Sequence, residues 1–76
     1  MKEVLEYLAR HLVDEPDAVE VTEVEGERSV ILQLRVAPDD MGKVIGKGGR
    51  TARALRSIVR AAGTRQGIST LVEIVE

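Results

Sequence analysis

A short run of glycines and cations holds the residues of this sequence that are best suited to chemistry. Gly46-Lys47-Gly48-Gly49 places three glycines in four positions, and Arg50 and Arg53 follow within one helical turn. Glycine adopts positive φ readily and has no Cβ to obstruct an approaching ligand. The free amides at the start of a helix bind anions. The residue types and their spacing therefore indicate a site for phosphate groups.

Two well-known phosphate-binding motifs do not fit this loop. A Walker A loop needs four residues between its first glycine and the Gly-Lys pair, followed by Ser or Thr. Here Gly42 to Gly46 leaves three, and Gly48 follows Lys47. A dinucleotide-binding loop needs a glycine where Thr51 stands, and a strand leading into the loop. Neither a nucleoside triphosphatase nor a dinucleotide-dependent enzyme is indicated.

The cations of the loop lie at an unfavourable place in the predicted structure. Lys47, Arg50 and Arg53 stand at the start of a helix, where each positive charge costs about 0.3 to 1 kcal/mol against the helix dipole. A bound phosphate would offset this cost. The alternative is that Lys and Arg are simply good helix formers on a solvated face.

Charge is distributed unevenly along the chain. The net charge is -2, but residues 1–40 hold four Lys or Arg against eleven Asp or Glu. The stretch from 41 to 72 contains no acid and seven cations, which are Lys43, Lys47, Arg50, Arg53, Arg56, Arg60 and Arg65. This asymmetry fits a basic functional surface on an acidic body. A charge dipole that only aids solubility is the alternative.

Composition argues against several classes of protein. The chain has 76 residues, no cysteine and one histidine, His11, so we expect a single domain over residues 1–76 with no catalytic residue, no metal site and no cofactor. No apolar run approaches the roughly 18 residues of a membrane span, and the start of the chain lacks the apolar core of a signal peptide. These features predict a cytoplasmic protein that is not an enzyme.

Hydrophobic periodicity predicts the elements before the loop. Apolar residues at helical spacing between Met1 and Leu12 predict a helix with one buried face, which Pro16 ends. A β-branched run from Ala18 to Val24 predicts a strand, and Val24 breaks its alternation, which suggests a bulge. A turn at residues 25–27, with Gly26 at positive φ, leads into a second strand. That strand spans Arg28 to Val36, and its alternating apolar residues are Val30, Leu32, Leu34 and Val36.

The remaining elements surround the glycine loop. Residues 37–40 predict a break and a helix start capped by an aspartate, followed by a short helix from Asp40 to Ile45. A second helix after the loop ends at Gly63, and its predicted apolar face comprises Leu55, Ile58, Val59 and Ala62. A last strand covers Leu71 to Val75. A right-handed crossover would place this strand parallel to the second one, which gives an α+β fold with a three-stranded mixed sheet and three helices on one face.

The segment around the loop resembles a known family. Val44-Ile45-Gly46-Lys47-Gly48-Gly49, continued by Arg50-Thr51-Ala52-Arg53-Ala54-Leu55, is similar to the signature of the KH domain, an Ile-Gly-x-x-Gly core followed by an aliphatic residue. The element order matches the type II arrangement, α-β-β-α-α-β. A lone domain of this length resembles the small bacterial RNA-binding proteins of the KhpA type.

The resemblance implies a mechanism and partners. The GxxG loop of KH domains clamps about four nucleotides of single-stranded RNA, which assigns phosphate contacts to the amides of Gly46, Lys47, Gly48 and Gly49. Lys47 would be the loop's charged contact, followed by Arg50, Arg53 and, more weakly, Lys43. Single-stranded RNA is thus one implied partner, and the others are a second copy of the chain or a larger KH protein of the KhpB/Jag type. The family further implies a role as RNA chaperone or post-transcriptional regulator linked to cell-wall biogenesis, cell shape and cell length.

Two further points concern the surface of the predicted helix after the loop. A helical wheel places Arg56 and Arg60 toward solvent. Ile58, beside Ala54 and Ala61, fits either the core, which the pattern favours, or a dimer contact. An alternative to RNA binding is therefore a protein-protein adaptor that dimerises and keeps a vestigial clamp.

Overall fold

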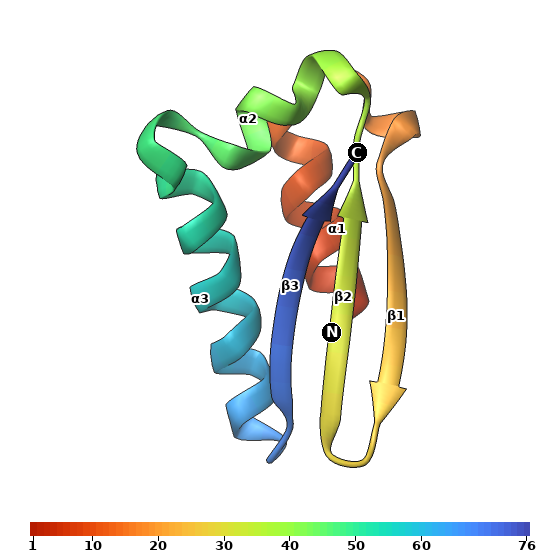
Figure 1. Cartoon of the computed structure of the whole chain (residues 1–76), viewed down its shortest axis with the longest axis vertical. Helices are drawn as coiled ribbons and strands as arrows, with labels where there is room; N and C mark the ends of the chain where they lie inside the picture. The colour runs from red at the N-terminus through yellow and green to blue at the C-terminus, as the bar shows by residue number, and fades with distance from the viewer.

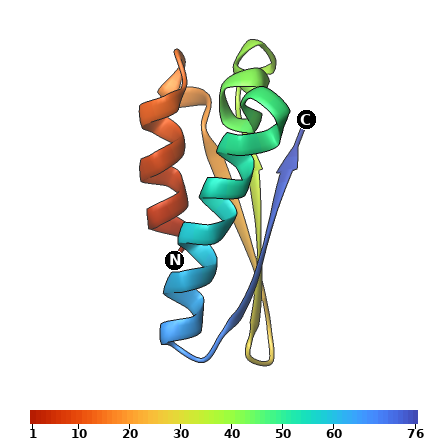
Figure 2. The same ribbon diagram turned by 90° about the vertical axis from the view of Figure 1, so that its left-hand side faces the viewer.

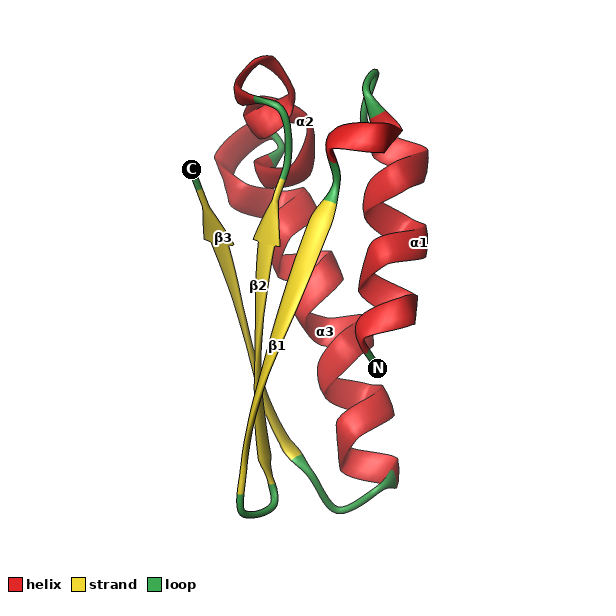
Figure 3. Ribbon diagram, turned by 90° about the vertical axis from the view of Figure 1, so that its right-hand side faces the viewer, coloured by secondary structure: helices red, strands yellow, loops and turns green.

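Three helices pack on one face of a three-stranded sheet in the computed structural model, which describes residues 1–76 (Figure 1). The elements are α1 (Lys2–Leu12), β1 (Glu20–Gly26), β2 (Ser29–Arg35), α2 (Met41–Ile45), α3 (Arg50–Arg65) and β3 (Ser69–Val75). Figure 2 and Figure 3 show all helices on the same side of the sheet, with its other face uncovered. The predicted α+β class, the element order and the layering are confirmed.

The sheet has the order β1-β2-β3. β1 pairs antiparallel with β2 through the hairpin, and β3 pairs with β2 in parallel, with Ser29 opposite Ser69 and Leu32 opposite Val72. The two-helix crossover makes this parallel pairing possible, as the sequence predicts. β3 is an edge strand beside α3, so one side of its backbone lacks a neighbouring strand.

The core lies between the sheet and the helices, and it fixes the position where the glycine loop begins. Val30, Leu32, Leu34 and Val36 are buried, which confirms the predicted alternation. Leu5 of α1, Val59 of α3 and Val44 of α2 are fully buried against them. Because Val44 comes two residues before Gly46, burial of its side chain fixes the point from which the loop departs.

The hairpin differs from the prediction in two respects. Gly26 pairs with Ser29, so the turn residues are Glu27 and Arg28, and the positive φ falls on Arg28 at 59°. A Cβ at Gly26 would lie 2.6 Å from the Ser29 Oγ and 3.9 Å from the Ser29 carbonyl oxygen, so rotation of the serine hydroxyl would relieve the contact. The predicted bulge is also absent, because the register runs without interruption and Val24 pairs with Ile31 on the uncovered face.

The end of α3 is also later than predicted. The helix continues to Arg65, and Gly63 is buried within it. A Cβ at Gly63 would lie 2.8 Å from the carbonyl oxygen of Ile68 and 2.6 Å from the Thr70 side chain. This glycine therefore allows helix and strand to approach closely and does not stop the helix. None of the helices has the length and apolar composition that crossing a bilayer requires.

Candidate functional site

The loop between α2 and α3 turns the chain through three residues of positive φ. Gly46, Gly48 and Gly49 have φ of 75°, 64° and 77°, a region that residues with a Cβ seldom occupy. α2 ends where the Gly46 N–H donates to the Gly42 carbonyl at 2.8 Å, and Lys47 to Gly49 form a single 3-10 turn that runs into α3. The positive φ predicted for these glycines is present at all three.

The glycines differ in what surrounds them. A Cβ at Gly46 would lie 2.2 Å from the Thr51 Oγ1 and 2.9 Å from the Thr51 backbone nitrogen. A Cβ at Gly48 would meet nothing within 4 Å. Gly46 therefore lets the loop close on α3, whereas Gly48 faces open space. Only the second arrangement leaves room for a ligand.

Two amides of the loop are free to donate outward. The backbone bonds of the turn run from Gly46 to Gly42, from Gly49 to Gly46 and from Arg50 to Lys47. The N–H groups of Lys47 and Gly48 take part in none of them. Unpaired amides at a helix start, with positive charge beside them, form an anion-binding arrangement.

The cations around the loop have no acidic partners. Lys47, Arg50 and Arg53 are exposed, and the ion pairs of the structure join Met1 to Glu3, Arg10 to Glu6, and Lys43 to Asp14 and Asp40. The Arg53 Nη1 lies 4.0 Å from the place of a Cβ on Gly49. Arg53 is thus folded back toward the loop, and the three side chains concentrate positive charge there.

Lys43 stands apart from this group. Its Nζ donates to a carboxylate oxygen of Asp14 and lies 3.4 Å from the Asp40 Oδ1. The hydrogen bond to Asp14 raises the pKa of Lys43 above its ordinary value despite partial desolvation. Local carboxylates already balance the charge of Lys43, unlike the charges of Lys47, Arg50 and Arg53.

Asp40 ties the base of α2 to the loop before β1. Its side chain makes no bond to the first amides of α2, so the predicted capping role is wrong. The Asp40 Oδ2 instead accepts the N–H of Glu15 at 3.1 Å, and the residue is 2% exposed. Burial alone would raise the pKa of Asp40, but the amides of Glu15 and Asp14 and the Lys43 ammonium outweigh it and hold this pKa below its usual range.

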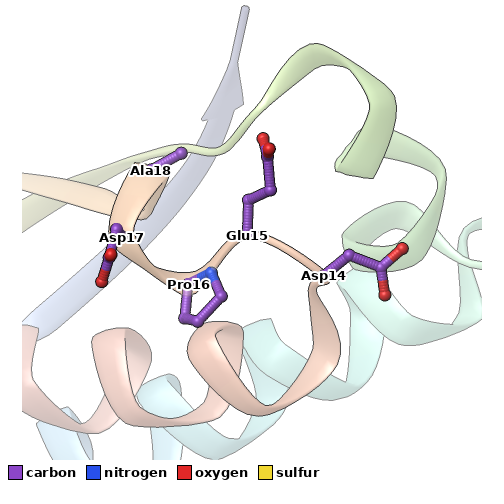
Figure 4. A pocket seen from close by; sticks show the side chains of 5 residues that line it. All are labelled: Asp14, Glu15, Pro16, Asp17 and Ala18. Atoms are coloured by element: carbon purple, nitrogen blue, oxygen red, sulfur yellow. The ribbon is translucent and has the colours of Figure 1, made fainter.

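The largest hollow of the surface does not coincide with the glycine loop. It is lined by Asp14, Glu15, Pro16, Asp17 and Ala18. Figure 4 shows the Glu15 side chain directed toward the segment that carries α2 and the Asp17 side chain directed the other way. Three carboxylates at this hollow make it unsuitable for phosphate. The candidate site is therefore the loop and not the hollow.

The position of the Arg56 side chain differs from the prediction made from the sequence. The helical wheel predicts that it points into solvent, but it is half-buried, and its Nε donates to the Val72 carbonyl of β3 at 3.3 Å. Arg60, one turn further along, is exposed as predicted. A signal in the sequence was the spacing of Arg53, Arg56 and Arg60, which places the three side chains along one side of α3.

Ile58 also differs from the favoured expectation. It is 47% exposed, so it does not belong to the core. Ala54 and Ala61, one turn away on either side, are exposed as well. The outer face of α3 therefore carries a small apolar surface made of Ala54, Ile58 and Ala61.

Comparison with known proteins agrees with this geometry. A family described as KhpA/KhpB, KH domain, matches residues 2–74. The chain is 55% identical to RNA-binding protein KhpA of Clostridium acetobutylicum over 75 residues, which are 99% of the chain and 100% of the relative. It is 42% identical to RNA-binding protein KhpA of Chlamydia trachomatis over 76 residues, which are 100% of the chain and 97% of the relative. No solved structure matches.

Proposed function

The chain belongs to the KhpA/KhpB family of KH domains, and we propose that it binds single-stranded RNA through the loop Gly46–Gly49. This is a binding family and not an enzyme family. The observation that carries the proposal is the pair of free amides at Lys47 and Gly48, which lie among exposed cations without acidic partners.

The proposed mechanism divides the RNA between two parts of the site. The amides of Gly46–Gly49 and the start of α3 hold phosphates, with Lys47, Arg50 and Arg53 supplying the charge. Bases extend from the clamp along α3 toward the edge of β3, as in KH domains generally. Tyr7 is the only aromatic side chain, so recognition depends on backbone donors and on cations without stacking on aromatic rings. Lys43 contributes least, because Asp14 and Asp40 already neutralise it.

A single clamp on about four nucleotides binds weakly, so we propose that two clamps act together. Linking two sites raises avidity through effective concentration. The exposed surface of Ala54, Ile58 and Ala61 supports a contact with a second copy or with a KH protein of the KhpB/Jag type. We place this assembly in the cytoplasm as an RNA chaperone or post-transcriptional regulator of cell-wall growth, cell shape and cell length.

The apolar surface also favours a second candidate, a dimerising adaptor with a vestigial clamp. The double variant Lys47→Asp/Gly48→Asp separates the two. Gly48 faces open space, and Asp tolerates the left-handed region better than most residues, so this variant should fold. We expect binding to a labelled uridine-rich RNA to weaken by roughly 10- to 100-fold or more, the range for loss of one or two charge-assisted hydrogen bonds.

A matched control is available at the other end of α3. Arg65→Asp/Gly67→Asp makes the same charge change, and Gly67 likewise has positive φ, 71°, with nothing within 4 Å. The 16 residues of α3 place it about 24 Å from the loop. It should bind RNA within about twofold of wild type. Equal binding by wild type and both variants, with circular dichroism showing all three folded, would refute the clamp and favour the adaptor.

A further inference from the structure

Arg56 lies in the seam where α3 meets the free edge of β3. Its Nε donates to the Val72 carbonyl at 3.3 Å, and it makes none of the ion pairs of the structure. Arg56 thus uses one of its five N–H donors on a neutral carbonyl and has no carboxylate partner.

The rest of the guanidinium faces outward. Every side-chain nitrogen or oxygen that is fully buried has a hydrogen-bond partner. The two Nη groups of Arg56 make no hydrogen bond within the protein, so they reach solvent. The Nε bond orients the planar group. The Nη edge is therefore an outward-facing fork whose geometry suits a ligand with two adjacent acceptors.

Arg56 is suitably placed relative to the clamp. It is two turns along α3 from Gly49, about 10 Å, and Arg53 stands between the two on the same side of the helix. In the proposed function the phosphates bind at the loop and the bases extend along α3 toward the edge of β3, so the group expected at this seam is a base attached to the clamped backbone. Contacts to phosphate position a nucleic acid, whereas contacts to base edges specify its sequence.

We propose that Arg56 is the specificity-determining residue of the RNA site and reads a base with two adjacent acceptors. Guanine offers O6 and N7, and cytosine offers N3 and O2. Adenine and uracil have no two adjacent acceptors on one edge, so neither matches the fork. The inference rests on the proposed RNA binding and adds to it a base preference at one position of the strand.

The test uses the full chain and uridine hexamers in which single positions are changed to guanosine, cytidine or adenosine. Fluorescence anisotropy should show wild type favouring guanosine or cytidine at one position by about fivefold or more, the lower end for a bidentate contact. Arg56→Lys keeps the charge but loses the fork, so it should lose this preference and bind uridine hexamer within about twofold of wild type. Arg60→Lys, one turn further along α3, should keep the preference.

Several outcomes would overturn the inference. A uniform loss of affinity for all RNAs in Arg56→Lys would make Arg56 a phosphate contact, and an unchanged preference would make it only a structural contact to β3. In wild-type protein, the Arg56 Nε–H resonance should shift with the preferred RNA and not with uridine hexamer, which tests the idea even if the variant fails to fold. If wild type binds no RNA at all, the proposed function fails as well.

Discussion

Gly46 and Gly48 both have positive φ, but alanine should mainly lower stability at Gly46 and mainly lower RNA affinity at Gly48. At Gly46, φ is 75° and ψ is 170°, a region that is essentially restricted to glycine and costs about 1 to 3 kcal/mol for other residues. A Cβ there also lies 2.7 Å from the Thr51 Cβ and 2.9 Å from its backbone nitrogen. Because backbone cannot move aside cheaply, we expect Gly46→Ala to lower the free energy of unfolding by about 3 kcal/mol or more.

Gly48→Ala should affect stability much less. With φ at 64° and ψ at 19°, the left-handed conformation costs about 1 to 2 kcal/mol, and reduced freedom of the unfolded chain returns about 0.4 to 1 kcal/mol. The net loss is about 1 kcal/mol. The added methyl group projects into the open space beside the free amides, so RNA binding should fall about tenfold, the value of one charge-assisted hydrogen bond.

Urea denaturation followed by circular dichroism measures the first quantity, and fluorescence anisotropy with a short single-stranded RNA measures the second. Gly67→Ala is the matched control, because Gly67 also has positive φ and the same open surroundings outside the loop. It should resemble Gly48→Ala in stability and wild type in RNA binding. Equal stability losses at Gly46 and Gly48, or equal RNA affinity at Gly48 and Gly67, would refute the distinction between the two glycines.

Two further predictions concern Asp40 and Ile58. Because the folded state lowers the pKa of Asp40, its ionised form contributes stability that is fully present above the unfolded pKa, about 3.9, and is lost as pH falls through the lower folded value. Wild type should therefore have a higher free energy of unfolding than Asp40→Asn at pH 7, and the two free energies should converge in the acid range. A difference that stays constant across pH would contradict this. If the proposed contact through Ala54, Ile58 and Ala61 joins two copies, Ile58→Asp should keep the fold, since Ile58 is 47% exposed, and should weaken self-association in sedimentation experiments at least tenfold, whereas Ser57→Asp should not.

Sequence patterns predicted most of the fold because its elements are strongly periodic. The alternation from Val30 to Val36 identified β2, and the crossover rule gave the direction of β3. The glycine loop was recognisable because positive φ is a local property of glycine. The predicted RNA contacts at its residues stay predictions until binding is measured.

Three of the errors share a cause, which is that a segment outside the local sequence pattern decides the role of a residue. Asp40 accepts an amide 25 positions away in the chain, so a local capping rule could not identify its partner. Gly63 is needed because Ile68 and Thr70 press against α3. A helical wheel places Arg56 relative to its own helix only, and the nearby edge of β3 turns that position into a half-buried one.

The parallel pairing of β2 with β3 also has a consequence for the order of folding. It joins residues such as Gln33 and Glu73, which are 40 positions apart and share a side-chain hydrogen bond of 3.2 Å, whereas the β1–β2 hairpin is local. Long-range pairing closes a large loop and forms slowly, so we expect the hairpin to form early and β3 to dock last. The same strand is expected to open first in the native state. RNA held across the seam of α3 and β3 would protect amides of β3 from hydrogen exchange, including those it does not touch.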